Sequence, residues 1–344
     1  MKGLCSMSMP DLASDPAKAI GAALARAPVE EIERVGGGRN SRVFRLVAGG
    51  RTYALKQYPS RADDPRDRLG TEVAALRWME GHGFSMVPRV VAFDAGANYA
   101  LLSWAEGRLV REAADGDVDQ AVTFLSRLHA LQDASAFSID RLATEACLSG
   151  TEIERQVRAR LQSLSVLPDS PALQAFLTDR FVPELERLFA AAHERMRAAG
   201  LSFASELPHA LRSLAPSDFG FHNALRDNAG NLTFIDFEYF GWDDPVKLVA
   251  DILLHPGTPV GAELRLRFRT AAESLYGNDP AFATRLGAYY SLFGLRWVLI
   301  LLNEFHPERW RRRQLAGATE DWGTAKTRQL RMAADLLNRI CRED

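Results

Sequence analysis

The chain has 344 residues, of which 47% are hydrophobic and 25% charged, and its formal net charge at pH 7 is −2. This composition excludes collagen-like, disordered and disulfide-scaffold proteins, each of which requires a strong compositional bias. The near-neutral charge gives no overall attraction to nucleic acid or to anionic membranes. The length favours two domains, or one large two-lobed unit with an ample core.

The cysteines and the apolar segments indicate a cytoplasmic protein. Cys5, Cys147 and Cys341 form no CxxC pair, which suits a reducing compartment better than secretion. The N-terminal residues lack the apolar segment of a signal peptide. The most apolar stretch, Tyr289 to Leu302, is interrupted by Arg296 and is too short to span a bilayer, so we expect a buried core helix there.

The first third of the chain is predicted to form a β-rich lobe. Residues 1–34 are expected to be an N-terminal extension with a short helix over 17–26. In residues 35–106, two strands at 43–47 and 52–58 flank Gly49 and Gly50, which indicates a hairpin. Apolar residues at helical spacing predict a helix over 67–80, and a second hairpin should turn around 95–97. The result is a small antiparallel lobe with one helix.

The remaining residues, 107–344, are predicted to be mainly helical. Periodic apolar residues indicate helices over 118–132, 151–164, 171–199, 262–276, 280–304 and 321–340. One β island interrupts them, with strands at 224–226 and 232–237 joined by the turn DNAGN. We therefore predict an α+β fold made of a small β-rich lobe and a larger helical lobe.

A glycine-rich segment, GGGRNSRVFR, precedes the first hairpin and contains Gly36, Gly37, Gly38, Asn40 and Ser41. A strand follows it, whereas a Rossmann turn leads into a helix, and no Gly-Lys-Ser/Thr closes it as in a P-loop. The segment is either a plain hairpin turn or a loop whose backbone amides lie over phosphates.

Lys56 lies inside the next strand, between residues that should be partly buried. Because an unpaired buried ammonium is costly, it needs an anionic partner, and Glu72 on the following helix is suitable. Either residue alone is more often a solvated surface charge. The order glycine loop, strand lysine, helix glutamate is that of protein-kinase-type folds.

The strongest signal is Asp218, followed five positions later by Asn223 and then, after a short hairpin, by Asp236. Phosphoryl transfer needs a carboxylate to accept the proton of the attacking hydroxyl, and oxygen ligands for Mg²⁺. Asp218-Phe219-Gly220 spells DFG, which marks the metal-binding aspartate of protein kinases. No aspartate occurs between Asp179 and Asp218 to serve as the upstream catalytic residue, so we assign Asp218 to the catalytic loop and Asp236 to the metal.

These segments together resemble the aminoglycoside phosphotransferase / choline kinase-like family. The resemblance spans residues 36–245 and rests on GGGRNSRVFR, YALK, TEVAAL, LLSWAEG, LHAL, SDFGFHN and IDFEYFGWDDP. It implies a bilobal protein-kinase-like fold. It also implies transfer of the γ-phosphate of ATP or GTP to a hydroxyl of a small metabolite or an aminoglycoside-like substrate, with Mg²⁺, by a monomer or homodimer that uses neither nucleic acid nor membrane.

The resemblance also implies roles for individual residues. Asp218 would be the catalytic base, and Asn223 and Asp236 would bind Mg²⁺. Lys56 would contact the α- and β-phosphates with Glu72 as its partner. The backbone of Ser103, Trp104 and Ala105 would meet the adenine.

Two positions depart from the family pattern. The usual His-Gly-Asp is replaced by Pro216-Ser217-Asp218, and the usual aspartate after Gly-Asp-Pro is replaced by Lys247 or Leu248. Asp251 could compensate for the second change. The alternative function that these departures leave open is a non-catalytic, kinase-like nucleotide-binding sensor or scaffold.

Other polar residues have two interpretations each. His222 could touch phosphate or metal, although a structural role in its loop is favoured. Asp244 could attract a cationic substrate together with Glu238 and Asp243, although we expect it to cap the next segment, just before Pro245.

Overall fold

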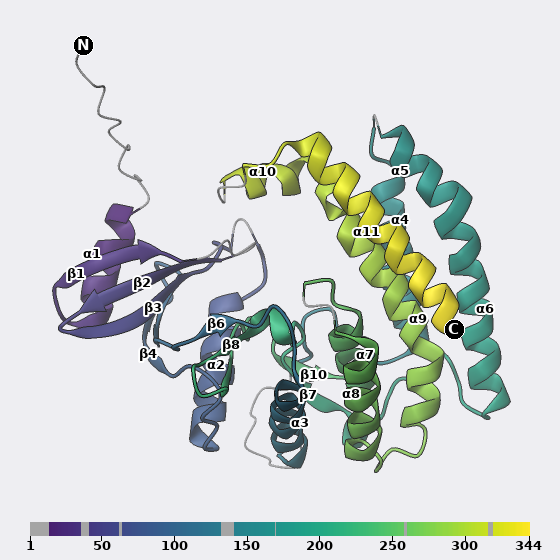
Figure 1. The fold of residues 1–344 in the computed structure, drawn as a ribbon, viewed down its shortest axis with the longest axis horizontal. Helices are drawn as coiled ribbons and strands as arrows, with labels where there is room; N and C mark the ends of the chain where they lie inside the picture. The colour runs from purple at the N-terminus through teal and green to yellow at the C-terminus, as the bar shows by residue number, and fades with distance from the viewer. Residues whose placement is uncertain are drawn as a thin grey trace. The chain divides into compact units, whose positions relative to one another are not determined.

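The computed structural model describes residues 14–35, 41–61, 64–131, 141–168, 170–257, 260–315 and 319–344 (Figure 1). The chain divides after Glu106 into a smaller N-terminal unit and a larger C-terminal unit. The α+β prediction is confirmed, because the first unit contains an antiparallel sheet and the second is mainly helical.

The smaller unit is built on a five-stranded antiparallel sheet in the order β1-β2-β3-β5-β4. Its strands are β1 (Val29–Arg34), β2 (Arg42–Ala48), β3 (Arg51–Gln57), β4 (Val90–Asp94) and β5 (Tyr99–Ser103). Gly49 and Gly50 join β2 to β3 with φ of 57° and 69°. A two-residue hairpin turn with positive φ at both positions favours glycine, so the predicted hairpin is confirmed for its predicted reason.

Two helices accompany the sheet, α1 (Ser14–Ala25) and α2 (Arg68–Gly81). Ala17 of α1 is buried in one core with Leu46 and Leu55 of the sheet. Because side chains alternate along a strand, Lys56 points away from that core, and it contacts α2. One face of β3 therefore packs into the apolar core, and the other face carries Lys56, which pairs with a charged residue of α2.

The short helix predicted over 17–26 is present as α1, whereas the sequence analysis contains no strand at the position of β1. The sequence predicts an N-terminal extension over residues 1–34; in its described part, α1 packs against the sheet and β1 is the edge strand of that sheet. The sequence VEEIER carries four charged residues and lies at the edge, where its side chains remain mostly solvated. A charged edge strand has little apolar alternation, so the sequence pattern did not reveal it.

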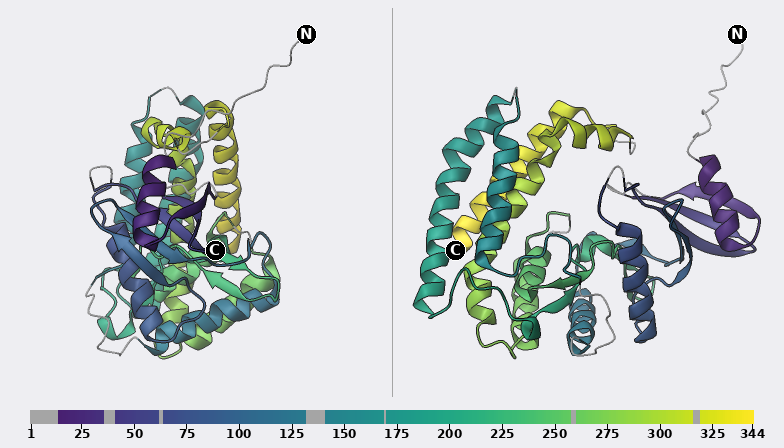
Figure 2. Two further views of the ribbon diagram at one scale, coloured as in Figure 1. Left: turned by 90° about the vertical axis from the view of Figure 1, so that its left-hand side faces the viewer. Right: turned by 180° about the vertical axis from the view of Figure 1, so that it is seen from behind.

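The larger unit is organised around α9 (Phe282–Leu301), which packs against α4 (Gly150–Ser165), α6 (Val182–Ala198), α7 (Pro245–Leu254) and α11 (Trp322–Glu343) (Figures 1 and 2). Within the described residues α9 and the turn after it form the one helix long and apolar enough to cross a membrane. Most of that helix is buried among its neighbours, as expected for the core helix that the sequence predicted.

The other helices are α3 (Asp115–Ala130), α5 (Pro171–Phe176), α8 (Ala262–Leu275) and α10 (Pro307–Leu315). The helix predicted over 171–199 is present but contains a π-helical turn, Leu177–Phe181, between α5 and α6. The sequence did not predict α7, a ten-residue helix whose residues are all buried, including the charged Lys247 and Asp251.

Short strands in the larger unit hold the loops of the candidate site. Strands β6 (Arg108–Leu109), β8 (Ala224–Arg226) and β9 (Leu232–Phe234) form one small sheet, and β7 (Ser213–Ala215) pairs with β10 (Gly241–Asp243). The β8–β9 hairpin is the predicted β island.

Candidate active site

The loop that carries Asp218 follows β7 and is fixed by its own hydrogen bonds. Ser217 adopts a left-handed backbone conformation with φ of 68°, and its hydroxyl donates to Thr144 O at 3.1 Å. The Asn223 amide Nδ2 donates to Asp218 O at 2.8 Å. Because the NH₂ group is used in this way, the Asn223 carbonyl oxygen Oδ1 is the atom that could coordinate a cation.

Phe219 anchors the same loop in the core. Its side chain is 4% exposed and its ring lies 4.6 Å from that of Phe234 and 5.3 Å from that of Phe124, centroid to centroid. The DFG sequence therefore places an aromatic anchor next to Asp218, and the neighbouring carboxylate side chain remains 35% exposed.

The β8–β9 hairpin sets the second candidate metal ligand beside the first. Ile235 N donates to Asn223 O at 2.9 Å, and Asp236 directly follows Ile235 in the chain. Asp236 adopts φ of 71°, a conformation that is rare outside glycine and that clusters at functional sites. A carboxylate and an amide oxygen are hard donors of the kind that Mg²⁺ prefers, so the residues present fit that ion.

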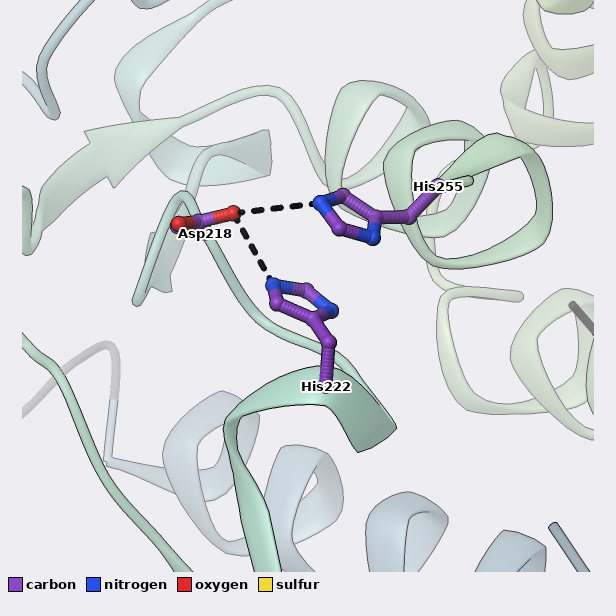
Figure 3. Close-up of side chains that lie close together, drawn as sticks. All are labelled: Asp218, His222 and His255. Carbon is purple, nitrogen blue, oxygen red and sulfur yellow. Dashed lines mark hydrogen bonds and ion pairs between the residues drawn. The ribbon is translucent and has the colours of Figure 1, made fainter. Parts of the chain in front are cut away.

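Two imidazoles surround Asp218 (Figure 3). His222 Nε2 lies 3.1 Å and His255 Nε2 lies 3.8 Å from Asp218 Oδ1. The two rings stack with centroids 3.5 Å apart and planes inclined by 10°. The sequence interpretation favoured a structural role for His222 and did not single out His255, which belongs to no motif.

The predicted lysine–glutamate pair lies in the smaller unit. Lys56 Nζ is 2.6 Å from Glu72 Oε2, and the Tyr58 hydroxyl donates to the same oxygen at 2.8 Å. Lys56 and Glu72 are 5% and 2% exposed. The counter-charge expected from the sequence is therefore in contact with its lysine, and a role toward nucleotide remains a prediction.

At the other predicted nucleotide-binding positions, the described residues give no contact that tests the prediction. Gly36, Gly37, Gly38 and Asn40 lie outside the described residues, and Ser41 is buried just before β2. Ser103 ends β5, where its backbone N–H donates to Arg89 O at 2.8 Å. Trp104 and Ala105 follow it and are half-buried. Their contact with adenine remains a prediction.

Lys247 is a buried charge that the sequence interpretation noted only as a departure from the family pattern. It is 1% exposed and lies 3.0 Å from Asp243 and 3.2 Å from Asp251. Burial alone would lower the pKa of Lys247, but the two carboxylates reverse this and raise it above its usual value. Its ammonium also donates to Ser217 Oγ at 3.4 Å, so this network reaches the residue before Asp218. Asp251, proposed as a substitute for the missing aspartate, acts here as a partner of Lys247.

The acidic residues after Asp236 have structural partners. Asp244 caps α7 by accepting from Val246 N at 2.8 Å and pairs with Arg285, which confirms the expected cap. Asp243 and Asp244 are 1% and 2% exposed. Buried to this extent, they are not placed to attract a cationic substrate.

Comparison with solved structures defines the class of fold. The chain is similar to a choline/ethanolamine kinase family protein from Mesorhizobium loti, with 17% identity, a TM-score of 0.57, and coverage of 95% of this chain and 97% of that one. It is also similar to choline kinase LicA from Streptococcus pneumoniae, with 16% identity, a TM-score of 0.58, and coverage of 95% and 99%. A spectinomycin phosphotransferase, solved with ADP and spectinomycin, shares 12% identity with a TM-score of 0.59 over 90% and 94%. The fold is therefore bilobal and protein-kinase-like.

The family follows from the sequence itself. The profile of the phosphotransferase enzyme family matches residues 31–286, and the chain belongs to that family. No curated protein matches the chain.

Proposed function

We propose that the protein is a small-molecule kinase that transfers the γ-phosphate of ATP or GTP to a hydroxyl of a small acceptor. The observation that carries this proposal is the loop geometry of the larger unit, where Asn223 holds the backbone of Asp218 and the β8–β9 hairpin sets Asp236 beside Asn223. This set supplies a carboxylate for the acceptor's proton and two oxygen donors for a divalent cation.

In the proposed reaction, the acceptor oxygen forms a bond to the γ-phosphorus while the bond between that phosphorus and the β–γ bridging oxygen breaks. The acceptor's proton passes to the Asp218 carboxylate, and the nucleoside diphosphate leaves with the bridging oxygen. Asp218 orients the hydroxyl for this attack, and most of the acceleration comes from positioning and charge stabilisation.

Asn223 Oδ1 and the Asp236 carboxylate would hold Mg²⁺, which when bound offsets the negative charge of the phosphates. Lys56, oriented by Glu72, would contact the α- and β-phosphates. The glycine-rich segment would cover the phosphates, and the backbone of Ser103 to Ala105 would meet the base.

The acceptor class follows from the relatives and from the chemistry. Choline and spectinomycin, named with the solved relatives, are small hydroxylated molecules. We therefore expect a small hydroxylated acceptor, and a monomer or homodimer in the cytoplasm that needs neither nucleic acid nor a membrane.

Replacing one carboxylate tests the proposal. Purified protein is incubated with Mg-ATP or Mg-GTP and with choline, ethanolamine, spectinomycin and a wider panel of hydroxylated metabolites, and phosphate transfer is measured. Asp218→Asn should lower kcat by about 10²- to 10⁴-fold because the amide cannot accept the proton. Nucleotide affinity, measured by calorimetry, should remain close to that of the wild type.

Equal turnover by wild type and Asp218→Asn would contradict the assignment of the base. Nucleotide binding that needs no metal, together with transfer to no acceptor, would instead favour the nucleotide-binding sensor or scaffold.

A further inference from the structure

His222 and His255 come from different elements and meet at one oxygen of Asp218. His222 belongs to the 3-10 turn Phe221–Asn223, and His255 is the C-terminal cap of α7. Both Nε2 atoms face Asp218 Oδ1, and only the 3.1 Å contact of His222 is of hydrogen-bond length (Figure 3). An ionised carboxylate only accepts, so the His222 ring donates from Nε2. The direct contact with Asp218 is thus made by His222.

The backbone fixes the tautomer of His255. Gly257 N lies 3.0 Å from His255 Nδ1, and a backbone amide can only donate. Nδ1 therefore carries the lone pair, and in the neutral ring the hydrogen is on Nε2, facing Asp218. A Cβ at residue 257 would lie 2.9 Å from Nδ1 and 2.7 Å from Cε1 of this ring, so the approach requires glycine.

The two rings are also held from outside. Trp297 meets the His255 ring edge to face, with centroids 4.6 Å apart and planes at 84°. The indole is itself fixed, because its Nε1 donates to Asp251 Oδ1 at 2.7 Å. On the other side His255 stacks on His222, and Gly220 leaves room for the His222 ring, since a Cβ there would lie 2.9 Å from Nδ1. His255 thus has little freedom to rotate.

We propose that His255 is a positioning residue for the candidate base. It holds the His222 ring by stacking and presents a second N–H toward Asp218 Oδ1, so that the carboxylate is kept in one orientation. With Oδ1 turned toward the imidazoles, Oδ2 is the oxygen assigned to the acceptor's hydroxyl. This inference rests on the proposed function, since it assigns a partner to the base named there.

The same geometry speaks against a transition-metal site at these three side chains. A histidine ligand offers the lone pair of one nitrogen to the ion, and two imidazoles on one ion must point their lone pairs at a common centre. Here the Gly257 contact leaves the hydrogen of His255 on Nε2, and the rings are stacked nearly parallel. Zinc binding is therefore an outcome that would contradict the proposal.

Two amide substitutions distinguish the effect of the N–H donor at Nε2 from the effect of side-chain size. In His255→Gln the amide nitrogen can occupy the place of Nε2, whereas in His255→Asn it falls near Nδ1 and cannot reach Asp218. We expect His255→Asn to lower kcat by about 10- to 100-fold, with the KM for Mg-ATP and the thermal midpoint near those of His255→Gln. His255→Gln should retain kcat within about threefold of the wild type. The matched control is His193→Asn, at a histidine of α6 that stacks on Phe203 and is 52% exposed, and it should leave kcat unchanged.

Asp218→Asn in the same assay separates this inference from the proposed function. If Asp218→Asn abolishes turnover while His255→Asn matches the wild type, only the positioning role is wrong. The same conclusion follows if His255→Gln loses as much kcat as His255→Asn, because the donor would then not be the cause. If Asp218→Asn retains turnover, the proposed function itself fails.

A second measurement does not depend on turnover. Nitrogen-15 NMR of the imidazoles, recorded above the ordinary histidine pKa at about pH 8, should place the hydrogen of His255 on Nε2. A hydrogen on Nδ1 would overturn the proposal. So would stoichiometric zinc that survives dialysis of the wild type and is lost from His255→Gln.

Discussion

Two lysines are buried in the described parts of the chain, one in each unit, and they are neutralised in different ways. Lys56 extends from a strand to Glu72, whose Oε2 also accepts from the Tyr58 hydroxyl. Lys247 lies on helix α7 between Asp243 and Asp251, four residues before and after it. Arg296 lies 3.7 Å from Asp251, so the second lysine belongs to a larger charge network.

The difference shows that burial of a charge does not by itself mark a ligand site. Asp251, at i+4, faces Lys247 on the same side of α7, as helix geometry requires. Asp243 lies at the end of β10, so Lys247 also connects α7 to that strand and to Ser217. The pair of Lys56 joins two elements that are separate in sequence, and its position after a glycine-rich segment suits an anionic ligand. We therefore expect loss of Lys247 to affect stability most, and loss of Lys56 to affect nucleotide use most.

The largest effect on stability is expected for Lys247→Met. This change removes the buried ammonium that lies between Asp243 and Asp251, so the free energy of unfolding should fall by about 3–5 kcal/mol, measured by urea denaturation. Lys18→Met, at an exposed lysine in α1, is the control and should change it by less than about 0.5 kcal/mol. Adding Asp243→Asn and Asp251→Asn to Lys247→Met should recover part of the loss. A Lys247→Met protein as stable as the wild type would remove the contrast between the two lysines.

Lys56→Met should have a smaller effect on folding and a larger one on nucleotide use. Because Tyr58 still donates to Glu72, we expect the free energy of unfolding to fall by about 1–3 kcal/mol. Loss of a cation that contacts the phosphates should lower kcat/KM for Mg-ATP by about 10²- to 10³-fold. Steady-state kinetics would measure kcat/KM, and urea denaturation would measure the free energy of unfolding. The kinetics of Lys247→Met would be compared under conditions in which that variant is folded. Unchanged kcat/KM in Lys56→Met would contradict its nucleotide role.

The smallest effect concerns the far end of the Lys247 network. Glu145 lies 2.5 Å from Arg296 and 2.5 Å from Arg160. Burial alone would raise the pKa of Glu145, but these two arginines lower it from 4.5 to about 2. A carboxyl whose folded pKa is depressed contributes stability that is present above its unfolded pKa and lost as pH falls toward the folded one. Since the side chain is 40% exposed, solvent screens the interaction and the contribution should be modest.

Glu145→Gln should therefore make the free energy of unfolding depend less on pH between 4.5 and about 2. Urea denaturation of wild type and variant at several pH values across this range would measure the difference. The control is Glu194→Gln, at an exposed carboxylate paired with Arg197. Parallel pH profiles for wild type and Glu145→Gln would show that Arg296 and Arg160 do not stabilise the ionised carboxylate.

The sequence predicted those features of the molecule that depend on the spacing of residues along the chain. The position of Lys56 inside a strand, between residues expected to be partly buried, predicted that it needed a partner, and Glu72 on the following helix is that partner. The interval from Asp218 to Asn223, with the hairpin before Asp236, predicted a loop and a hairpin, and these are joined by hydrogen bonds of Asn223 to Asp218 O and from Ile235 N. The roles of the three side chains remain predictions.

The remaining parts depend on tertiary packing. His255 lies 37 positions after Asp218, and nothing in the residues around it indicates that the end of α7 returns to the loop of Asp218. The contact of Lys247 with Ser217 is equally remote in sequence. Strand β1 and helix α7 were also missed: β1 is a charged edge strand, and α7 is a short helix whose charged residues are buried in pairs.

The backbone of Ser217 has a consequence for how this protein can change by mutation. A left-handed conformation costs a non-glycine residue about 1–2 kcal/mol, yet the serine hydroxyl here joins Thr144 to Lys247. Glycine could occupy the position with the same backbone and without the hydroxyl, whereas a β-branched residue could not adopt it without distorting the approach to Asp218. Few substitutions at residue 217 can therefore be tolerated during evolution. Those that are tolerated keep the backbone conformation of the loop even when the serine hydroxyl is lost.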